Sequence, residues 1–111
     1  MYKSIIREDG SDECIYVLIT DKQNGGEYQW FIDMPGEKKV KAVPIDNEKA
    51  PCISISTKDV RERGWDGLQI HCVNMNEEFG VSKSEKTILY GSAREAEMSG
   101  LYDASAFGSR M

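Results

Sequence analysis

The sequence predicts an α+β fold, made of a mostly antiparallel β-sheet of about six or seven short strands, a short middle helix and a C-terminal helix. Short apolar runs rich in β-branched and aromatic residues recur between turn-forming clusters. Strand and helix patterns do not alternate regularly, which argues against a doubly wound parallel sheet. The chain has 111 residues, 40% of them hydrophobic, which favours a single compact domain over residues 1–111.

The chain begins with three predicted strands. Residues 2–7 form a β-prone run that a polar loop ends. Residues 14–20 are nearly all apolar, which is typical of a central strand with both faces covered. Gly25 and Gly26 then permit a chain reversal, so residues 27–34 are expected to form a hairpin with the preceding strand.

Alternation indicates which face of the third strand is buried. The period of two gives it one fully apolar face, made by Tyr28, Trp30, Ile32 and Met34. Residues 39–45 alternate more weakly, and residues 52–56 can form another short strand. These segments complete the strands expected before the middle helix.

A short helix and two strands are expected next. Ser56 begins a capping-box pattern, which predicts a helix over residues 57–63. Residues 68–75 follow a tight turn and alternate with the period of two, which favours an internal strand. Residues 87–90 form the last expected strand, after a polar segment that is interpreted as a loop.

The C-terminal helix is expected to begin at Ala93, because Ser92 and Glu95 form a Ser-x-x-Glu capping box. Residues 105–111 are small apart from Phe107, which predicts a flexible tail unless Phe107 finds a pocket. A sandwich or partly rolled barrel closed by a C-terminal helix has this set of elements. In the number of its elements the chain resembles pleckstrin-homology-like modules, although no binding motif of that family is visible.

The charge balance argues against generic nucleic-acid binding. Fourteen Lys and Arg against 19 Asp and Glu give a net charge of −5, and an acidic surface repels a phosphate backbone. The excess of negative charge is spread evenly along the chain: residues 1–50 carry seven positive and ten negative charges, and residues 51–111 carry seven positive and nine negative charges. No apolar run approaches the roughly 18 residues that span a bilayer, and the N-terminal segment is too charged for a signal peptide. We therefore expect no membrane association and a cytoplasmic location, which is the host cytoplasm if the protein is viral.

Motifs for catalysis, metals and cofactors are not visible. Cys14, Cys52 and Cys72 are odd in number and lie in apolar segments, which is typical of reduced core thiols. The single histidine, His71, adjoins Cys72, but neighbouring strand residues point to opposite faces and do not easily share a metal. The glycines at 25–26 lack the residues that complete a phosphate-binding loop. We expect no metal and no cofactor.

The remaining signal is an aromatic residue among carboxylates. Trp65 lies beside Asp66 in a Gly-flanked turn, and acidic residues cluster in the first loop and again at 77–78. Exposed aromatic side chains rimmed by carboxylates are typical of surfaces that bind a basic protein partner. The residues expected to bind this partner are Asp9, Asp12, Glu13, Trp65 and Asp66.

The sequence thus favours a small, acidic, non-catalytic protein-binding module that inhibits or neutralises a protein partner. Phage inhibitors of host defence and bacterial toxin-immunity proteins are of this kind. Two alternatives stay open. A small enzyme would use His71 with a carboxylate such as Asp66 or with a cysteine. An accessory subunit or homodimer would shield the apolar faces of Tyr16 and Trp30. If the ring of Trp65 folds back onto the sheet, it is not part of a binding surface.

Overall fold

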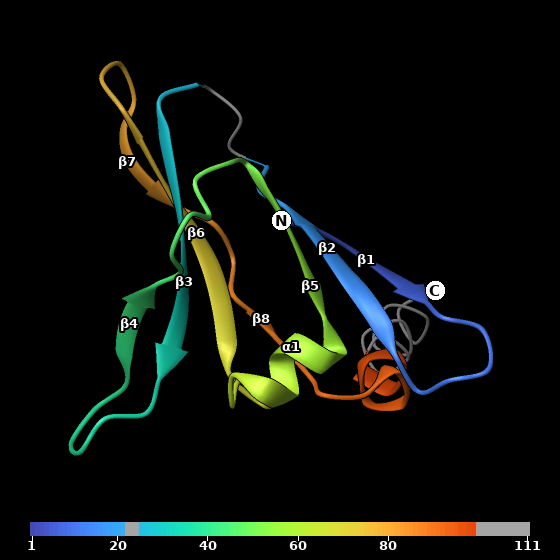
Figure 1. Ribbon diagram of the computed structural model, residues 1–111. Helices are drawn as coiled ribbons and strands as arrows, with labels where there is room; N and C mark the ends of the chain where they lie inside the picture. The colour runs from blue at the N-terminus through green and yellow to red at the C-terminus, as the bar shows by residue number, and fades with distance from the viewer. Residues whose placement is uncertain (22–24, 100–111) are drawn as a thin grey trace, which may run out of the picture.

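A computed structural model describes residues 1–21 and 25–99 (Figure 1). Within these residues the chain forms eight strands in two antiparallel sheets, together with two short helices. The expected α+β class is therefore confirmed. None of the helices in this part of the chain is long and apolar enough to cross a membrane.

The first sheet has three strands in the order β1–β2–β5, with bounds Tyr2–Arg7, Cys14–Ile19 and Cys52–Ser56. β2 is central and pairs antiparallel with both neighbours. On one of its faces Tyr16 and Leu18 are fully buried, whereas Ile15 on the other face is 39% exposed. The expectation that both faces of this strand are covered is wrong, because the core lies on one side of the sheet only.

The second sheet has five strands. They are β3 (Glu27–Met34), β4 (Lys41–Pro44), β6 (Gln69–Asn76), β7 (Gly80–Lys83) and β8 (Thr87–Ile88). Their order is β4–β3–β6–β7, and β8 also pairs with β6. β3 and β6 form the centre, where Trp30 lies opposite Cys72, so the expected internal strand near residues 68–75 is confirmed.

The expected hairpin between residues 14–20 and 27–34 is wrong. β2 and β3 belong to different sheets. Both edges of β2 are already occupied, by β1 and by β5, so its backbone has no ladder positions left for β3. β3 instead pairs with β4 and β6, which makes the segment between β2 and β3 a crossover from one sheet to the other.

Both helices begin where their capping residues predict. α1 (Thr57–Glu62) starts after Ser56, whose Oγ accepts a hydrogen bond from the Asp59 backbone at 3.1 Å. Residues 93–99 are helical, and the Oγ of Ser92 accepts a hydrogen bond from the Glu95 backbone at 3.2 Å. The end of the second helix and the expected tail at residues 105–111 lie outside the described residues.

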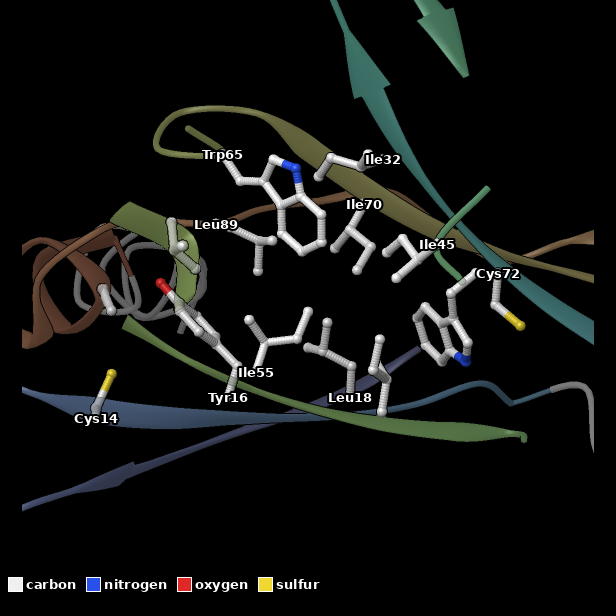
Figure 2. Close-up of a cluster of buried hydrophobic side chains, with 14 of the residues drawn as sticks. Cys14, Tyr16, Leu18, Ile32, Ile45, Ile55, Trp65, Ile70, Cys72 and Leu89 are labelled. Carbon is white, nitrogen blue, oxygen red and sulfur yellow. The ribbon is translucent and has the colours of Figure 1, made fainter. Parts of the chain in front are cut away.

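The core fills the space between the two sheets (Figure 2). Tyr16, Leu18 and Ile55 point inward from the first sheet, and Ile32 and Ile70 face them from the second. Trp30 has the largest fully buried side chain among the described residues, at 0% exposed. Its Nε1 donates a hydrogen bond to the Ala50 carbonyl oxygen at 2.8 Å. The inner faces are thereby closed, and each sheet presents its other face outward.

Candidate functional site

Trp65 is part of the core. Its side chain is 8% exposed and lies beside Ile32 and Leu89 between the sheets (Figure 2). Gly64, at a φ of 71°, turns the chain after α1, and the Trp65 backbone donates to the Val60 carbonyl oxygen at 2.8 Å. Of the two alternatives left open by the sequence, the structure shows the one in which the ring of Trp65 folds back onto the sheet, so Trp65 is not an exposed binding residue.

Glu13, another expected binding residue, is half-buried and engaged by two side chains of α1. Its carboxylate accepts a hydrogen bond from Arg61 Nη2 at 2.6 Å and a second from the hydroxyl of Thr57. These two hydrogen bonds lower the pKa of Glu13 from its ordinary value, and the bond from Arg61 has the larger effect. Glu13 therefore joins the first loop to α1.

Asp12 and Asp66 belong to the same network. Asp12 Oδ1 accepts from the Arg94 backbone at 2.8 Å, and Asp66 Oδ1 accepts from the Gly91 backbone at 3.0 Å. Both carboxylates thereby hold the segment that leads into the C-terminal helix. Asp9 is exposed in the first loop. A role of these acidic residues in partner binding stays a prediction. Asp12, Glu13 and Asp66 also form hydrogen bonds within the protein.

The β6–β7 hairpin carries the same combination of apolar and acidic side chains on its solvent side. Met75, Phe79 and Val81 are 44%, 65% and 67% exposed. Met75 and Val81 lie directly opposite each other, and Phe79 follows in the turn. The hairpin forms one end of the second sheet, at the top left of Figure 1. We call the hairpin patch the set formed by Met75, Phe79, Val81, Glu27, Glu77 and Glu78.

An open hollow of about 710 Å³ adjoins the hairpin. Glu27, Glu77 and Glu78 line it together with Met75 and Val81, and no Lys or Arg is among the described residues that do so. A second hollow of about 450 Å³ shares Glu27 and Met75 and continues along the outward face of β3. The surface at the first hollow is therefore apolar in part and locally negative, whereas Lys49 also lines the second.

The turn of the hairpin is fixed by Asn76. Its Oδ1 accepts hydrogen bonds from the backbones of Glu78 at 2.8 Å and Phe79 at 3.1 Å. Gly80 then adopts a φ of 78°, which favours glycine. These contacts fix the backbone of the turn that carries Phe79 before any partner binds, which reduces the entropy that binding would cost.

The base of the hairpin is tied to the start of β3. Asn74 Nδ2 donates to the carbonyl oxygens of Gly25 at 2.9 Å and Glu27 at 3.1 Å. Gly26 has a φ of 87°, and a Cβ atom there would collide with the Met75 carbonyl oxygen. The close backbone approach explains why glycine occupies this position and keeps Glu27 beside the hairpin.

His71 lies beside a carboxylate, but the carboxylate is Asp33 and not Asp66. His71 Nδ1 is 3.6 Å from Asp33 Oδ1, and Lys86 Nζ donates to the other oxygen of Asp33 at 2.6 Å. Phe31 stacks on the imidazole with ring centres 5.5 Å apart. The side chains of His71 and Asp33 are only 5% and 6% exposed, and Nδ1 has no hydrogen-bond partner among the described residues.

The pKa of His71 predicts how stability depends on pH. Burial lowers this pKa from its ordinary value of 6.5; Asp33 opposes the shift, whereas Lys86 and Lys83 add to it. Below about pH 6.5 His71 is protonated in the unfolded chain but stays largely neutral in the folded chain. The free energy of unfolding therefore falls as the pH decreases toward the lowered pKa. Above about pH 8, where the imidazole is neutral in both states, His71 makes no contribution to the pH dependence.

Urea unfolding at pH 5.5 and 7.5 checks this prediction. Because His71 is the single histidine, a His71→Gln variant removes the imidazole titration in this interval. The wild type should lose more stability than the variant between the two pH values. A larger loss in the variant would mean that the imidazolium is stabilised by Asp33, contrary to the burial argument.

The three cysteines occupy different environments. Cys14 and Cys72 are buried, and burial raises the pKa of both thiols, that of Cys72 to about 11. Cys52 is exposed, so the expectation of three core thiols is wrong for this residue. Cys52 lies on the outward face of β5, an edge strand that pairs with β2.

In comparisons with known proteins, no family model matches the chain, and neither a curated protein nor a solved structure matches it. Its function is therefore inferred from its own surface. Sequence reasoning missed Phe79 and Val81, because the segment after residue 75 was interpreted as a polar loop, and it missed the exposure of Met75, because this residue was placed in an internal strand. The available signal was Asn76 followed by Gly80, a turn pattern between two apolar segments that favours a hairpin.

Proposed function

We propose that this chain is a small, non-catalytic protein-binding module that captures and neutralises a protein partner with a basic surface. The observation that carries the proposal is the hairpin patch, in which exposed Met75 and Val81 line an acidic hollow and exposed Phe79 lies in the adjoining turn. Phage inhibitors of host defence and bacterial toxin-immunity proteins act by such capture. Neutralisation follows when the covered surface of the partner is the one that it needs for its own activity.

The chemistry of the hairpin patch suits this role. Burying an exposed apolar side chain such as Phe79 contributes about 1.5–3 kcal/mol, and aromatic residues are frequent at the centres of interfaces. The carboxylates of Glu77 and Glu78 would attract a positively charged partner and speed association. Lys or Arg side chains of the partner fit the acidic hollow, where their aliphatic stems contact Met75 and Val81.

Capture from lysate with matched charge variants tests the proposal. Wild type, Glu78→Lys and Asp9→Lys are used as baits in nuclease-treated lysate of the source organism, or of its host if the protein is viral, and bound proteins are identified by mass spectrometry. Each variant changes the net charge by +2, and both positions are exposed. Wild type and Asp9→Lys should recover one stoichiometric basic protein, which Glu78→Lys should lose.

Two outcomes of the capture experiment would contradict the proposal. Recovery of the wild-type bait alone would mean that no such partner is present under these conditions. Loss of capture in Asp9→Lys but not in Glu78→Lys would place the binding surface at the first loop, as the sequence suggested, instead of at the hairpin.

A second candidate function is a small enzyme, favoured by the buried pair of His71 and Asp33. A carboxylate beside an imidazole is a common arrangement for a general base; here the two groups are 3.6 Å apart and share no hydrogen bond. His71→Gln separates the two candidates, because the binding function predicts capture at the wild-type level. Loss of an enzymatic activity in that variant, with the fold intact by circular dichroism, would favour the enzyme.

A further inference from the structure

The outward face of the first sheet is uncharged. Its three strands pair in register, so that three rows of three side chains face away from the core. We call this set the outer face; its residues are Tyr2, Ile19 and Cys52 in one row, Ser4, Val17 and Ser54 in the next, and Ile6, Ile15 and Ser56 in the third. Tyr2, Ile6 and Ile15 are 67%, 56% and 39% exposed. No Asp, Glu, Lys or Arg occupies any of these nine positions.

The size of the side chains changes across the outer face. β1, at one edge of the sheet, contributes the large side chains of Tyr2 and Ile6, whereas β5, at the other edge, contributes only Cys52 and two serines. β2 lies between them with branched aliphatic residues. Figure 1 shows the three strands side by side in this order. The face is therefore raised along one edge and low along the other.

We propose that the outer face binds a second copy of this chain, in a dimer whose two-fold axis runs parallel to β2. Such an axis places β1 of each copy over β5 of the other copy. The β2 strands of the two copies then face each other across the axis. Tyr2 then lies over Cys52 of the second copy, and Ile6 over Ser56. Large side chains facing small ones fill the space between two sheets, which favours close packing, and the contact is isologous because each copy supplies the same patch.

The absence of charge on the outer face supports a second copy as the occupant. Each chain carries a net charge of −5, so two copies repel each other over most of their surface and approach most easily through an uncharged face. Strand spacing and rise give the outer face about 15 by 20 Å, or roughly 300 Å². That is less than the roughly 800 Å² per partner of a standard interface, so the dimer is weak and forms only at high protein concentration. The inference does not depend on the proposed partner, because the hairpin patch lies on the other sheet.

Sedimentation and thiol labelling test the dimer together. Cys52 serves as the reporter, because Cys14 and Cys72 are buried. As the concentration rises from about 5 to about 500 μM, a range suited to weak association, the average mass should rise toward twice that of the chain and maleimide labelling of Cys52 should slow several-fold. Ile15→Glu should stay monomeric and label rapidly at every concentration, whereas Met75→Glu on the second sheet should behave like wild type.

A designed disulfide tests the direction of the axis. In Tyr2→Cys, a mild oxidant should join residue 2 of one copy to Cys52 of the other, and peptide mapping should recover that pair. Within one chain these positions are separated by β2, about 10 Å at the usual strand spacing, which is too far for a disulfide.

Three results would overturn the inference. The first is a monomer mass at every concentration with Cys52 labelled freely. The second is slow labelling that does not depend on concentration, since a segment of the same chain would then cover the face. The third is a disulfide between the two copies of residue 2, because that pair requires a different axis.

Discussion

A Trp30→Ala variant is expected to lose about 3–5 kcal/mol of folding stability. Trp30 is fully buried in the core between the two sheets, so its removal leaves a cavity that rigid neighbouring strands cannot close. The Ala50 carbonyl oxygen also loses the hydrogen bond that Nε1 donates at 2.8 Å. A domain of ordinary stability has about 5–15 kcal/mol in total, so the variant should be largely unfolded at 37 °C or close to it.

Urea unfolding followed by tryptophan fluorescence and circular dichroism measures the effect. Tyr2→Ala is the matched control, because it also removes an aromatic ring, but one that is 67% exposed. At a concentration that keeps the protein monomeric, the control should change stability by less than about 0.5 kcal/mol. A loss below about 1.5 kcal/mol for Trp30→Ala would mean that the ring is not enclosed between two packed sheets.

Much of the fold can be predicted from residue alternation and from caps, because both act over a few neighbouring residues. The period of two identified the buried face of the third strand, where Trp30 and Ile32 are at most 2% exposed. Ser56 and Ser92 identified both helix starts, since a side-chain oxygen at the N-cap satisfies a backbone N–H of the first turn. Local bonds of this kind need no knowledge of the rest of the chain.

Strand pairing could not be predicted in the same way. Gly25 and Gly26 are as compatible with a crossover between sheets as with a tight hairpin. The choice depends on β5, whose residues 52–56 occupy the edge of β2 that a hairpin would have needed. The additional strand β7 (Gly80–Lys83) was missed for a related reason, because a four-residue edge strand with two polar residues resembles a loop.

The candidate site was predicted by its composition but not by its location. The sequence shows that aromatic and acidic residues adjoin at Trp65 and Asp66, but it does not show that Asp66 bonds to Gly91 or that Trp65 turns inward. Exposure depends on the three-dimensional position of a turn. At the other acidic turn the neighbouring ring, Phe79, faces solvent instead, because it lies at the tip of a hairpin that extends the edge of the sheet.

A Phe79→Ala variant is expected to bind the captured partner about 30-fold or more weakly than wild type, which corresponds to about 2 kcal/mol. Phe79 is 65% exposed and makes little contribution to the core, so the folded state should be unchanged. The backbone hydrogen bond from Phe79 to Asn76 does not involve the ring, so alanine keeps the turn. The loss should arise mainly in the dissociation rate, because an apolar contact at the centre of an interface has little influence on long-range encounter.

The most direct test of the proposed function is a calorimetric titration of the purified partner into wild type, Phe79→Ala and Tyr2→Ala. Both variants remove an exposed aromatic ring, one from the hairpin patch and one from the outer face of the other sheet. The proposal predicts a loss of about 30-fold for Phe79→Ala and wild-type affinity for Tyr2→Ala. Equal affinities for wild type and Phe79→Ala would contradict binding through the hairpin patch.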